Sequence, residues 1–424
     1  MIKKHLSTFL LATTLSITAG AQSASAEDLG ITAFYGDKAL GRVVVMDVDN
    51  MKFKAEVYTK GIDPYPVDQA GTLDKVYAIT RGSNSIDVID SNTLEPMGLI
   101  NLPHYPRSSE AYNATLGLQL VTGVDKPMAT LIDVNTDKAV ASVGLNEIFS
   151  VQDYGGSNAT GHPFWFDENK FALIDRPNRN IQVYVVRRGM AGQGKAGRGG
   201  MGRVGTTLLD TVPTPTAVHH FVKTASGDNI FYALSEGAPA LDISPSILKY
   251  ELKGGKLNFL AEVALSDENV ADMGSHHADM HPDGIHMYIG STEGNVYVLD
   301  THTMKIVKTI PAGLGAGHTT FVSQRNIAIV TNHKDTFVSI IDTKAHKLIK
   351  NVTVSKIPYT GTILQSHSTF VHPDMNFFYA FATASGVFYE LNLETLEVSR
   401  SVETGGTPLQ GVFMCQGEGC ENLM

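Results

Sequence analysis

Histidine is the residue type in this sequence with the most distinctive chemistry, because its neutral imidazole is a ligand for zinc and copper. Seven of the 15 histidines stand in five short segments that lead into strand-like sequence. These residues are His162, His219 and His220, His276 and His277, His318, and His367. If the fold brings the five segments together, their imidazoles predict a metal site.

The paired histidines set a condition on the local backbone. His276 and His277 come shortly before a His-Pro-Asp-Gly turn that starts at His281, so we expect the pair to lie on the strand that ends there. Neighbouring residues of a strand face opposite ways. Both members of a pair can therefore face one site only where the strand is just starting or is irregular.

A strand pattern that recurs along the chain is the element that must position these histidines. Each copy has an apolar strand, an Asp or Asn, a short polar turn and a second alternating strand, which together describe a β-hairpin. The six clear copies begin at Val44, Asp87, Thr130, Tyr297, Ser339 and Tyr389. Two more short strands precede each hairpin after the first, and a four-stranded unit of about 40 to 55 residues is typical of a β-propeller blade.

Weaker copies of the unit bring the count to eight. They include the strands predicted at 180–186 and 246–252. The eighth unit is split between the two ends of the chain, with predicted strands at 31–35, 42–47, 53–58 and, innermost, 408–414. Both ends then close the ring, which leaves no free sheet edge. We therefore predict an all-β propeller with eight blades, and seven blades is the alternative if one weak unit has been divided wrongly.

The innermost strand of each blade lines the central channel of a propeller, and the seven histidines begin five consecutive innermost strands. Aligned on the strand that follows, His276, His318 and His367 fall at one level. The other three innermost strands offer oxygen atoms that can bind a metal or hold an imidazole in place: Asp68, Glu110 and Gln410. The alternative interpretation is that the histidines only satisfy buried polar groups in a wet channel.

The start of the chain has the form of a secretory signal peptide over residues 1–26. Lys3 and Lys4 give a basic start, 6–19 is apolar, and Ala24-Ser25-Ala26 is a small-residue cleavage site. The apolar stretch is short for a membrane anchor, which is the alternative. The net charge is −10, and losing two lysines leaves 31 basic against 43 acidic residues, or −12. We expect residues 27–424 to form one periplasmic, monomeric domain that binds neither nucleic acid nor membrane.

Two further features concern the ends and the insertions of the propeller. Cys415 and Cys420 are separated by a glycine-containing loop, and in an oxidising compartment this spacing favours a local disulfide; a thiolate metal site is the alternative. Residues 187–205 are basic and glycine-rich, so we expect a surface loop between the last two strands of the third blade. The loop is either a tolerated insertion or a basic arm for an acidic partner.

With these features together, the chain resembles the periplasmic zinc metallochaperones of the AztD family. The resemblance runs from about Ile31 to the Cys415/Cys420 loop, and residues 275–284 are its most specific part. It implies a propeller that binds zinc without being an enzyme and delivers the zinc to the solute-binding protein of a zinc ABC transporter. Members can also carry a His/Asp-rich N-terminal segment; residues 27–41 here contain acidic residues and no histidine.

Two other functions are kept as alternatives. The chain is more loosely similar to copper oxidoreductases such as nitrous oxide reductase and thiocyanate dehydrogenase, which gather propeller histidines around a multicopper centre. A propeller scaffold without metal is the third interpretation. No nucleophile elbow, phosphate-binding loop or dinucleotide fingerprint occurs in a suitable setting. The remaining histidines of the predicted domain fall in turns or outer strands and are expected to be solvated: His104, His281, His286, His302, His333, His346 and His372.

Overall fold

The computed structural model describes residues 29–149, 158–189, 203–224, 227–238, 242–265 and 275–415, without the side chains of Ser275 and His276. The predicted signal peptide, the centre of the glycine-rich segment and Cys420 lie outside these residues. The leader, the surface loop and the disulfide therefore stay predictions. No helix in the described ranges is long and apolar enough to cross a membrane.

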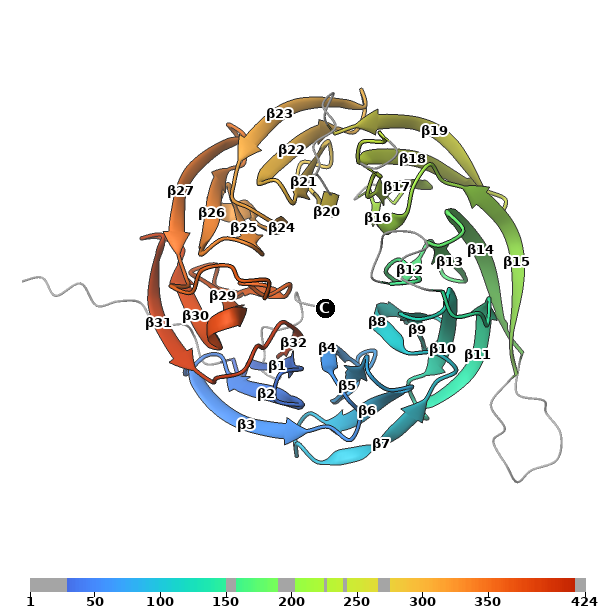
Figure 1. The fold of residues 1–424 in the computed structure, drawn as a ribbon, viewed down its shortest axis with the longest axis horizontal. Coiled ribbons are helices and arrows are strands. Elements are labelled where there is room, and N and C mark those ends of the chain that lie inside the picture. The colour runs from blue at the N-terminus through green and yellow to red at the C-terminus, as the bar shows by residue number, and fades with distance from the viewer. Residues whose placement is uncertain are drawn as a thin grey trace, which may run out of the picture.

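Eight four-stranded antiparallel sheets are arranged in a ring around a central channel (Figure 1). The strands of the first four blades, from the channel outward, are β4 (Pro64–Gln69), β5 (Lys75–Thr80), β6 (Ser85–Asp90) and β7 (Pro96–Asn101); β8 (Pro106–Asn113), β9 (Leu118–Gly123), β10 (Met128–Asp133) and β11 (Lys138–Gly144); β12 (Phe164–Trp165), β13 (Lys170–Asp175), β14 (Asn180–Arg188) and β15 (Val204–Pro213); β16 (Val218–Lys223), β17 (Ile230–Ser235), β18 (Ser246–Lys253) and β19 (Lys256–Ala264).

The remaining four blades follow the same order. Their strands are β20 (Ser275–Met280), β21 (His286–Ser291), β22 (Asn295–Asp300) and β23 (Lys305–Pro311); β24 (Ala316–Val322), β25 (Ile327–Asn332), β26 (Phe337–Asp342) and β27 (Lys347–Thr353); β28 (Thr369–Val371), β29 (Phe377–Ala382), β30 (Val387–Asn392) and β31 (Glu397–Glu403); β32 (Gln410–Met414), β1 (Thr32–Asp37), β2 (Arg42–Asp47) and β3 (Lys52–Tyr58). Two short 3₁₀ turns, η3 (Ser323–Arg325) and η4 (Thr383–Ser385), connect strands.

The position of a strand in its blade explains its composition. The two middle strands are covered by the neighbouring blades on both faces, so β5 and β29 are buried along their whole length. The outermost strands face solvent, and in β7 only Ile100 is buried. The recurring Asp at the end of the third strand closes the turn that follows: Asp90 accepts the backbone N–H groups of Asn92 and Thr93 at 2.9 and 2.8 Å. The pattern seen in the sequence is thus an Asp-closed hairpin.

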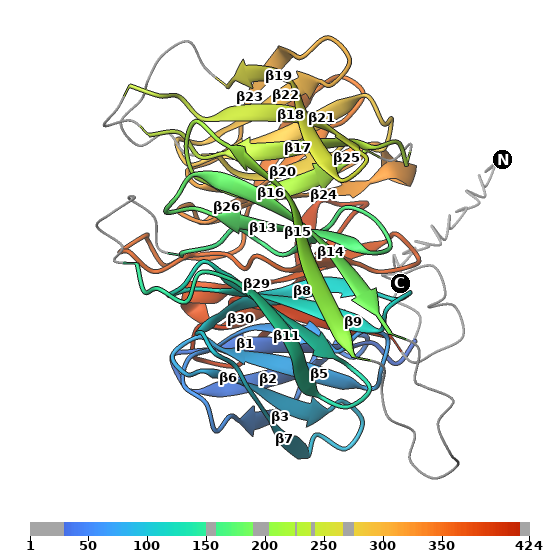
Figure 2. The same cartoon turned by 90° about the vertical axis from the view of Figure 1, so that its right-hand side faces the viewer.

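The ring closes through a blade built from both ends of the chain. β32 pairs antiparallel with β1, next to β2 and β3, so the prediction of eight blades is confirmed and the seven-blade alternative is wrong. Tyr35 of β1 packs edge-on against Phe381 of the preceding blade and Phe413 of β32, with ring centroids 4.7 and 5.7 Å apart. Seen from the side, the described chain forms a thick disc (Figure 2).

Three histidines predicted to be solvated are buried: His104, His333 and His372. His104 contacts Thr130 and His333 contacts the backbone of Gln365 through hydrogen bonds. His372 lies at the seam beside the split blade, with Nε2 3.4 Å from Asp49 and Nδ1 2.9 Å from Asp374. These residues were misjudged because a turn of one blade can be covered by the neighbouring blade, which the local sequence does not reveal.

His372 makes the stability of the seam depend on pH. Burial alone would lower the pKa of His372, but the bonds to Asp49 and Asp374 outweigh burial and raise it. The protonated form therefore stabilises the fold fully below the pKa of unfolded histidine, about 6.5, and this contribution is lost as the pH rises through the folded pKa. We expect His372→Leu to cost roughly 3 kcal/mol at pH 6, because Asp49 keeps a buried carboxylate without its partner.

The measurement is urea unfolding of wild type and His372→Leu at pH 6 and pH 8.5. The difference between the two proteins should shrink at pH 8.5. His302→Leu is the matched control, because His302 is exposed in a turn, and it should change neither value. Equal destabilisation of His372→Leu at both pH values would contradict a charged His372 at the seam.

Candidate metal centre

Irregularities at the start of the innermost strands turn the histidines toward the channel. The pairing shifts between Val218 and Phe221 in β16, between Ser275 and His277 in β20, and between Ala316 and Thr319 in β24. Each shift is a bulge in which extra residues face one position on the partner strand. The bulge in β16 lets His219 and His220 approach the same site although they are neighbours.

The pairing of the strands also corrects the prediction of which histidines are equivalent in the ring. Phe221, Ala278 and Thr319 each pair with the third-last residue of the strand that follows. The residues directly before them are equivalent in the ring: His220, His277 and His318. The set predicted to be equivalent was His276, His318 and His367. In β20 and before β28 the predicted histidine therefore lies one residue too early in the sequence. The side chain of His276 lies outside the description.

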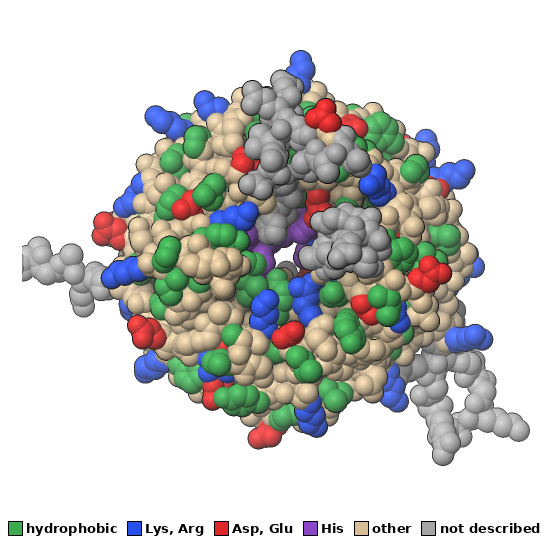
Figure 3. Space-filling view, viewed as in Figure 1, with side chains coloured by type: hydrophobic (Ala, Val, Ile, Leu, Met, Phe, Trp, Pro, Cys, Tyr) green, Lys and Arg blue, Asp and Glu red, His purple; other side chains and the backbone are tan. Residues whose placement is uncertain are grey.

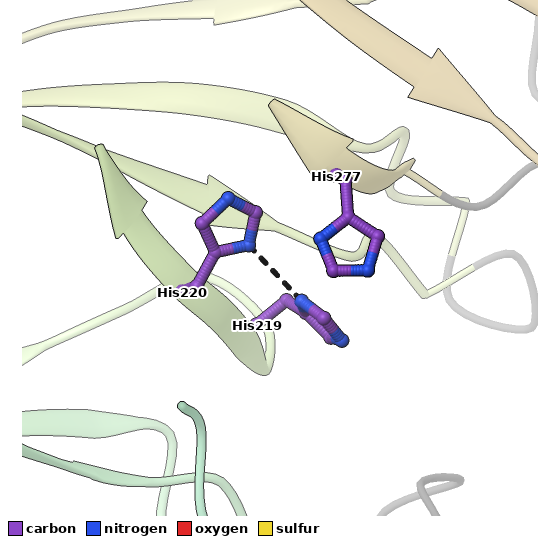
Figure 4. A group of neighbouring side chains, drawn as sticks. All are labelled: His219, His220 and His277. Carbon is purple, nitrogen blue, oxygen red and sulfur yellow. Dashed lines mark hydrogen bonds between the residues drawn. The ribbon is translucent and has the colours of Figure 1, made fainter. Parts of the chain in front are cut away.

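Three of the predicted histidines form a group that could hold one metal ion. One ring nitrogen from each of His219, His220 and His277 lies within 4.8 Å of the others. Figure 4 shows the three rings pointing toward one another, two from β16 and one from β20. The Nδ1 atoms of His219 and His220 are 3.0 Å apart. Two nitrogens bound to the same zinc at about 2.0–2.1 Å must also be close neighbours, so the spacing suits a shared ion.

His162 and Glu110 extend the group on one side. The ring centroid of His162 lies 4.8 Å from that of His219 and 6.1 Å from that of His277. Nδ1 of His162 is hydrogen-bonded to the carboxylate of Glu110. A carboxylate on one ring nitrogen leaves the other nitrogen available as a ligand and fixes its direction. Glu110 was predicted either to bind a metal or to hold an imidazole in place. The structure shows it holding the imidazole of His162.

His318 and His367 extend the group on the other side. His318 stacks on His277 with ring centroids 3.4 Å apart, and His367 lies 5.7 Å from His318. His333, which the sequence analysis left in a solvated turn, lies 4.4 Å from His367. Tyr65 Oη is 3.2 Å from Nδ1 of His367. The described part of the channel therefore holds a continuous row of imidazoles.

Burial keeps several imidazoles of the row neutral. It lowers the pKa of His220 to about 3 and lowers the pKa of His162 and His318 well below the ordinary value. The positive charge of Arg107 acts in the same direction on His162, and His333 does so on His318 when it is protonated. A neutral imidazole keeps a nitrogen lone pair for a metal. The site is therefore ready to bind a cation over the physiological pH range.

Two carboxylates, the buried Asp68 and the half-buried Asp279, lie near the row without being ligands in this arrangement. Asp68, a predicted oxygen ligand, accepts hydrogen bonds from the backbone N and Oγ of Ser109 at 3.0 and 2.7 Å. Asp279 accepts the backbone N–H of Thr319 at 2.8 Å. Burial raises the pKa of each to about 7, and Glu110 adds to the effect on Asp68. Their second oxygens remain as acceptors at the channel.

Two cavities share this region. One of about 430 Å³ is lined by Glu110, His162, His220, His277 and Gln410 among others. A second of about 950 Å³ is lined by residues that include His318, His367 and Asp279. His318 and Asp279 line both cavities. A small ion can therefore reach the histidines from the channel.

Sequence reasoning missed a set of channel residues that directly follow the second strand of a blade. Arg81 follows β5, Arg176 follows β13, Glu236 follows β17 and His333 follows β25. Arg107, near the start of β8, was missed as well. The signal was present, because an alignment of the blade repeats puts the first four residues at one position of the unit.

Comparison with known proteins establishes the fold. No protein-family model and no curated protein sequence matches this chain. Among solved structures, the dihydro-haem d1 dehydrogenase NirN in complex with DHE matches with a TM-score of 0.62 and 13% identity over 92% of this chain and 76% of that one. Apo AztD from Citrobacter koseri matches with 0.58 and 12% over 92% and 99%. The periplasmic gluconolactonase PpgL of Pseudomonas aeruginosa matches with 0.55 and 12% over 91% and 99%.

These structures share the propeller with this chain and differ among themselves in what their names say they do. The similarity to AztD agrees with the family resemblance found in the sequence at the level of fold. At such identities the site residues, rather than the fold, must carry any argument about function.

Proposed function

We propose that this protein is a periplasmic zinc metallochaperone, a carrier and not an enzyme, that delivers zinc to the solute-binding protein of a zinc ABC transporter. The observation that carries the proposal is the approach of one ring nitrogen from each of His219, His220 and His277 to within 4.8 Å. Zinc binds imidazole nitrogen with tetrahedral geometry, and His162 beside the group is a fourth nitrogen donor.

The surroundings of the group favour a cargo that is bound and then released. An imidazole binds a metal through a nitrogen lone pair of its neutral form, so no charge on the ligands themselves holds a divalent ion. Nε2 of His219 accepts a hydrogen bond from Arg107 at 3.3 Å, and because guanidinium can only donate, that lone pair is already engaged. Nδ1 of His219 can bind a metal only if the ring proton lies on Nε2, so a metal at either ring nitrogen ends the hydrogen bond from Arg107. This competition supports exchange with a partner over permanent storage.

Transfer is the property that tests the proposal. Zinc-loaded protein is mixed with an apo zinc solute-binding protein in the presence of a chelator of intermediate affinity. We expect zinc to reach the partner faster than it appears in the chelator when the partner is absent, because ligand exchange between docked proteins avoids the free ion. Transfer at the rate of spontaneous release would reduce the protein to a zinc store. Copper-loaded protein serves as the control for metal selectivity.

A copper oxidoreductase is the second candidate, and one observation favours it. His318, His333 and His367 continue the row beyond the first group, so the described channel has more imidazoles than one zinc needs. Copper also accepts imidazole ligands, and a centre of several copper ions would absorb visible light and exchange electrons. Reproducible redox turnover of the copper-loaded protein would replace the carrier role.

A further inference from the structure

Three guanidinium groups gather beside the histidines. Arg81, Arg107 and Arg176 all lie close enough to His162 to contribute to its lowered pKa. They come from three successive blades, after β5, within β8 and after β13. In the space-filling view, Lys and Arg side chains border the opening through which histidine is visible (Figure 3). Positive charge is therefore concentrated at the end of the channel that holds the imidazoles.

Only one of these charges is matched by a carboxylate contact. Arg176 forms an ion pair with Glu236. Arg81 and Arg107 take part in none of the ion pairs found among the described residues. The nearby Glu110 is bound to His162. Two guanidinium groups beside the histidine row are thus left without an anionic contact.

Their hydrogen bonds go to neutral groups. Arg107 is 3% exposed and donates to the carbonyl oxygen of Thr160 and to Nε2 of His219. Arg81 donates to Oδ1 of Asn158 at 2.8 Å, and its guanidinium carbon lies 5.0 Å from the centre of the Tyr65 ring. The Nε atom of Arg81 is buried and has no hydrogen-bond partner. Donors remain for another acceptor.

Burying a charge without a counter-charge in contact with it is unfavourable, so guanidinium groups in this position favour the binding of an anion. Burial, together with the neighbouring Arg176 and Arg81, lowers the pKa of Arg107 to about 9, and the carboxylates of Glu236 and Glu110 oppose this shift. Even at this pKa Arg107 is cationic at neutral pH. The fork of a guanidinium matches the two oxygens of a carboxylate or a phosphate.

We propose that Arg81 and Arg107 form a binding site for a small oxyanion, of the carboxylate or phosphate class, beside the metal-binding histidines. This anion site goes beyond the proposed carriage of zinc and does not depend on it. An anion that takes the donors of Arg107 releases Nε2 of His219 from its hydrogen bond. Anion binding and metal binding at His219 are therefore coupled in the same direction, and the anion is placed where it could also contact the ion.

The test is calorimetric titration of inorganic phosphate, and separately of acetate, into the metal-free full chain at low ionic strength. We expect saturable binding of at least one of the two anions to the wild type. Arg81→Gln and Arg107→Gln should each weaken it about 10-fold or more, because each removes charge-assisted hydrogen bonds. Arg187→Gln is the matched control, because Arg187 is exposed on β14, and it should bind like wild type.

Circular dichroism checks that each variant is folded, and Arg81→Gln keeps the test decisive if the buried Arg107 cannot be replaced. No saturable binding of phosphate or acetate by the wild type would overturn the proposal, and so would equal binding by both arginine variants and the control. Zinc content, measured separately by dialysis, reports on the carrier function. A protein that binds phosphate but no zinc retains the anion site and loses the proposed function.

Discussion

His277→Ala is expected to lower zinc affinity by roughly 100-fold or more, since the free energy of a structural zinc site, about 10–16 kcal/mol, is shared among about four ligands. His277 contacts His219 and His220 on one side and stacks on His318 on the other, so its loss opens the group at its centre. Competition with a fluorescent zinc chelator at neutral pH gives the dissociation constants.

A histidine outside the channel provides the control for this loss. His302→Ala removes an exposed imidazole from the turn after β22 and should leave zinc affinity unchanged. His219→Ala should resemble His277→Ala. If His277→Ala binds zinc as tightly as His302→Ala does, the group of His219, His220 and His277 is not the zinc site.

A chain that ends at Leu409 is expected to lose most of its stability, because it lacks β32. The missing strand pairs with β1 from Gly36 to Thr32, and its Phe413 stacks on Phe370 with ring centroids 4.7 Å apart. Without it, β1 becomes a buried, apolar strand with an open edge, and such edges aggregate. The loss of several kcal/mol is comparable to the whole stability of a domain, about 5–15 kcal/mol.

Soluble yield and urea unfolding measure this effect. A chain that ends at Cys415 retains β32 and is expected to fold. Gly411→Ala tests the same contact with one methyl group, because a Cβ there would lie 1.9 Å from the carbonyl oxygen of Phe34. Gly205→Ala, where the nearest atom would be 4.0 Å away, is the control. A soluble, cooperatively unfolding chain ending at Leu409 would show that the ring does not need β32 to close.

The fold could be predicted because each blade repeats the same local pattern of strands and turns. An Asp such as Asp90 closes the same hairpin in blade after blade, and the alternation of an outer strand is read directly from residues 347–353. Closure by the two ends followed because a propeller has no other way to complete a split blade. These patterns involve residues that are close together in the chain, so they can be recognised in a single sequence.

The site was predicted in part, because convergence depends on contacts between blades. The histidines were found since they mark the start of five consecutive strands. The bulge that brings His219 and His220 together was not predictable, because it depends on how β16 pairs with β17. Arg107 was missed for a similar reason: no local motif marks it, and its role appears only when three blades meet at His162. Arg81 stands at a repeated position of the blade, but that position alone does not place it beside the histidines.

The split blade also fixes the order in which this molecule can be completed during synthesis. Every histidine of the channel row lies between residues 162 and 367, whereas β32 begins at Gln410. A nascent chain therefore contains all of these imidazoles before it contains the strand that closes the ring. The distances between the imidazoles depend on how the blades pack in the closed ring, so the histidines alone do not make the site. We therefore expect the affinity for metal to arise only at the end of translation, when the last strand docks beside the first.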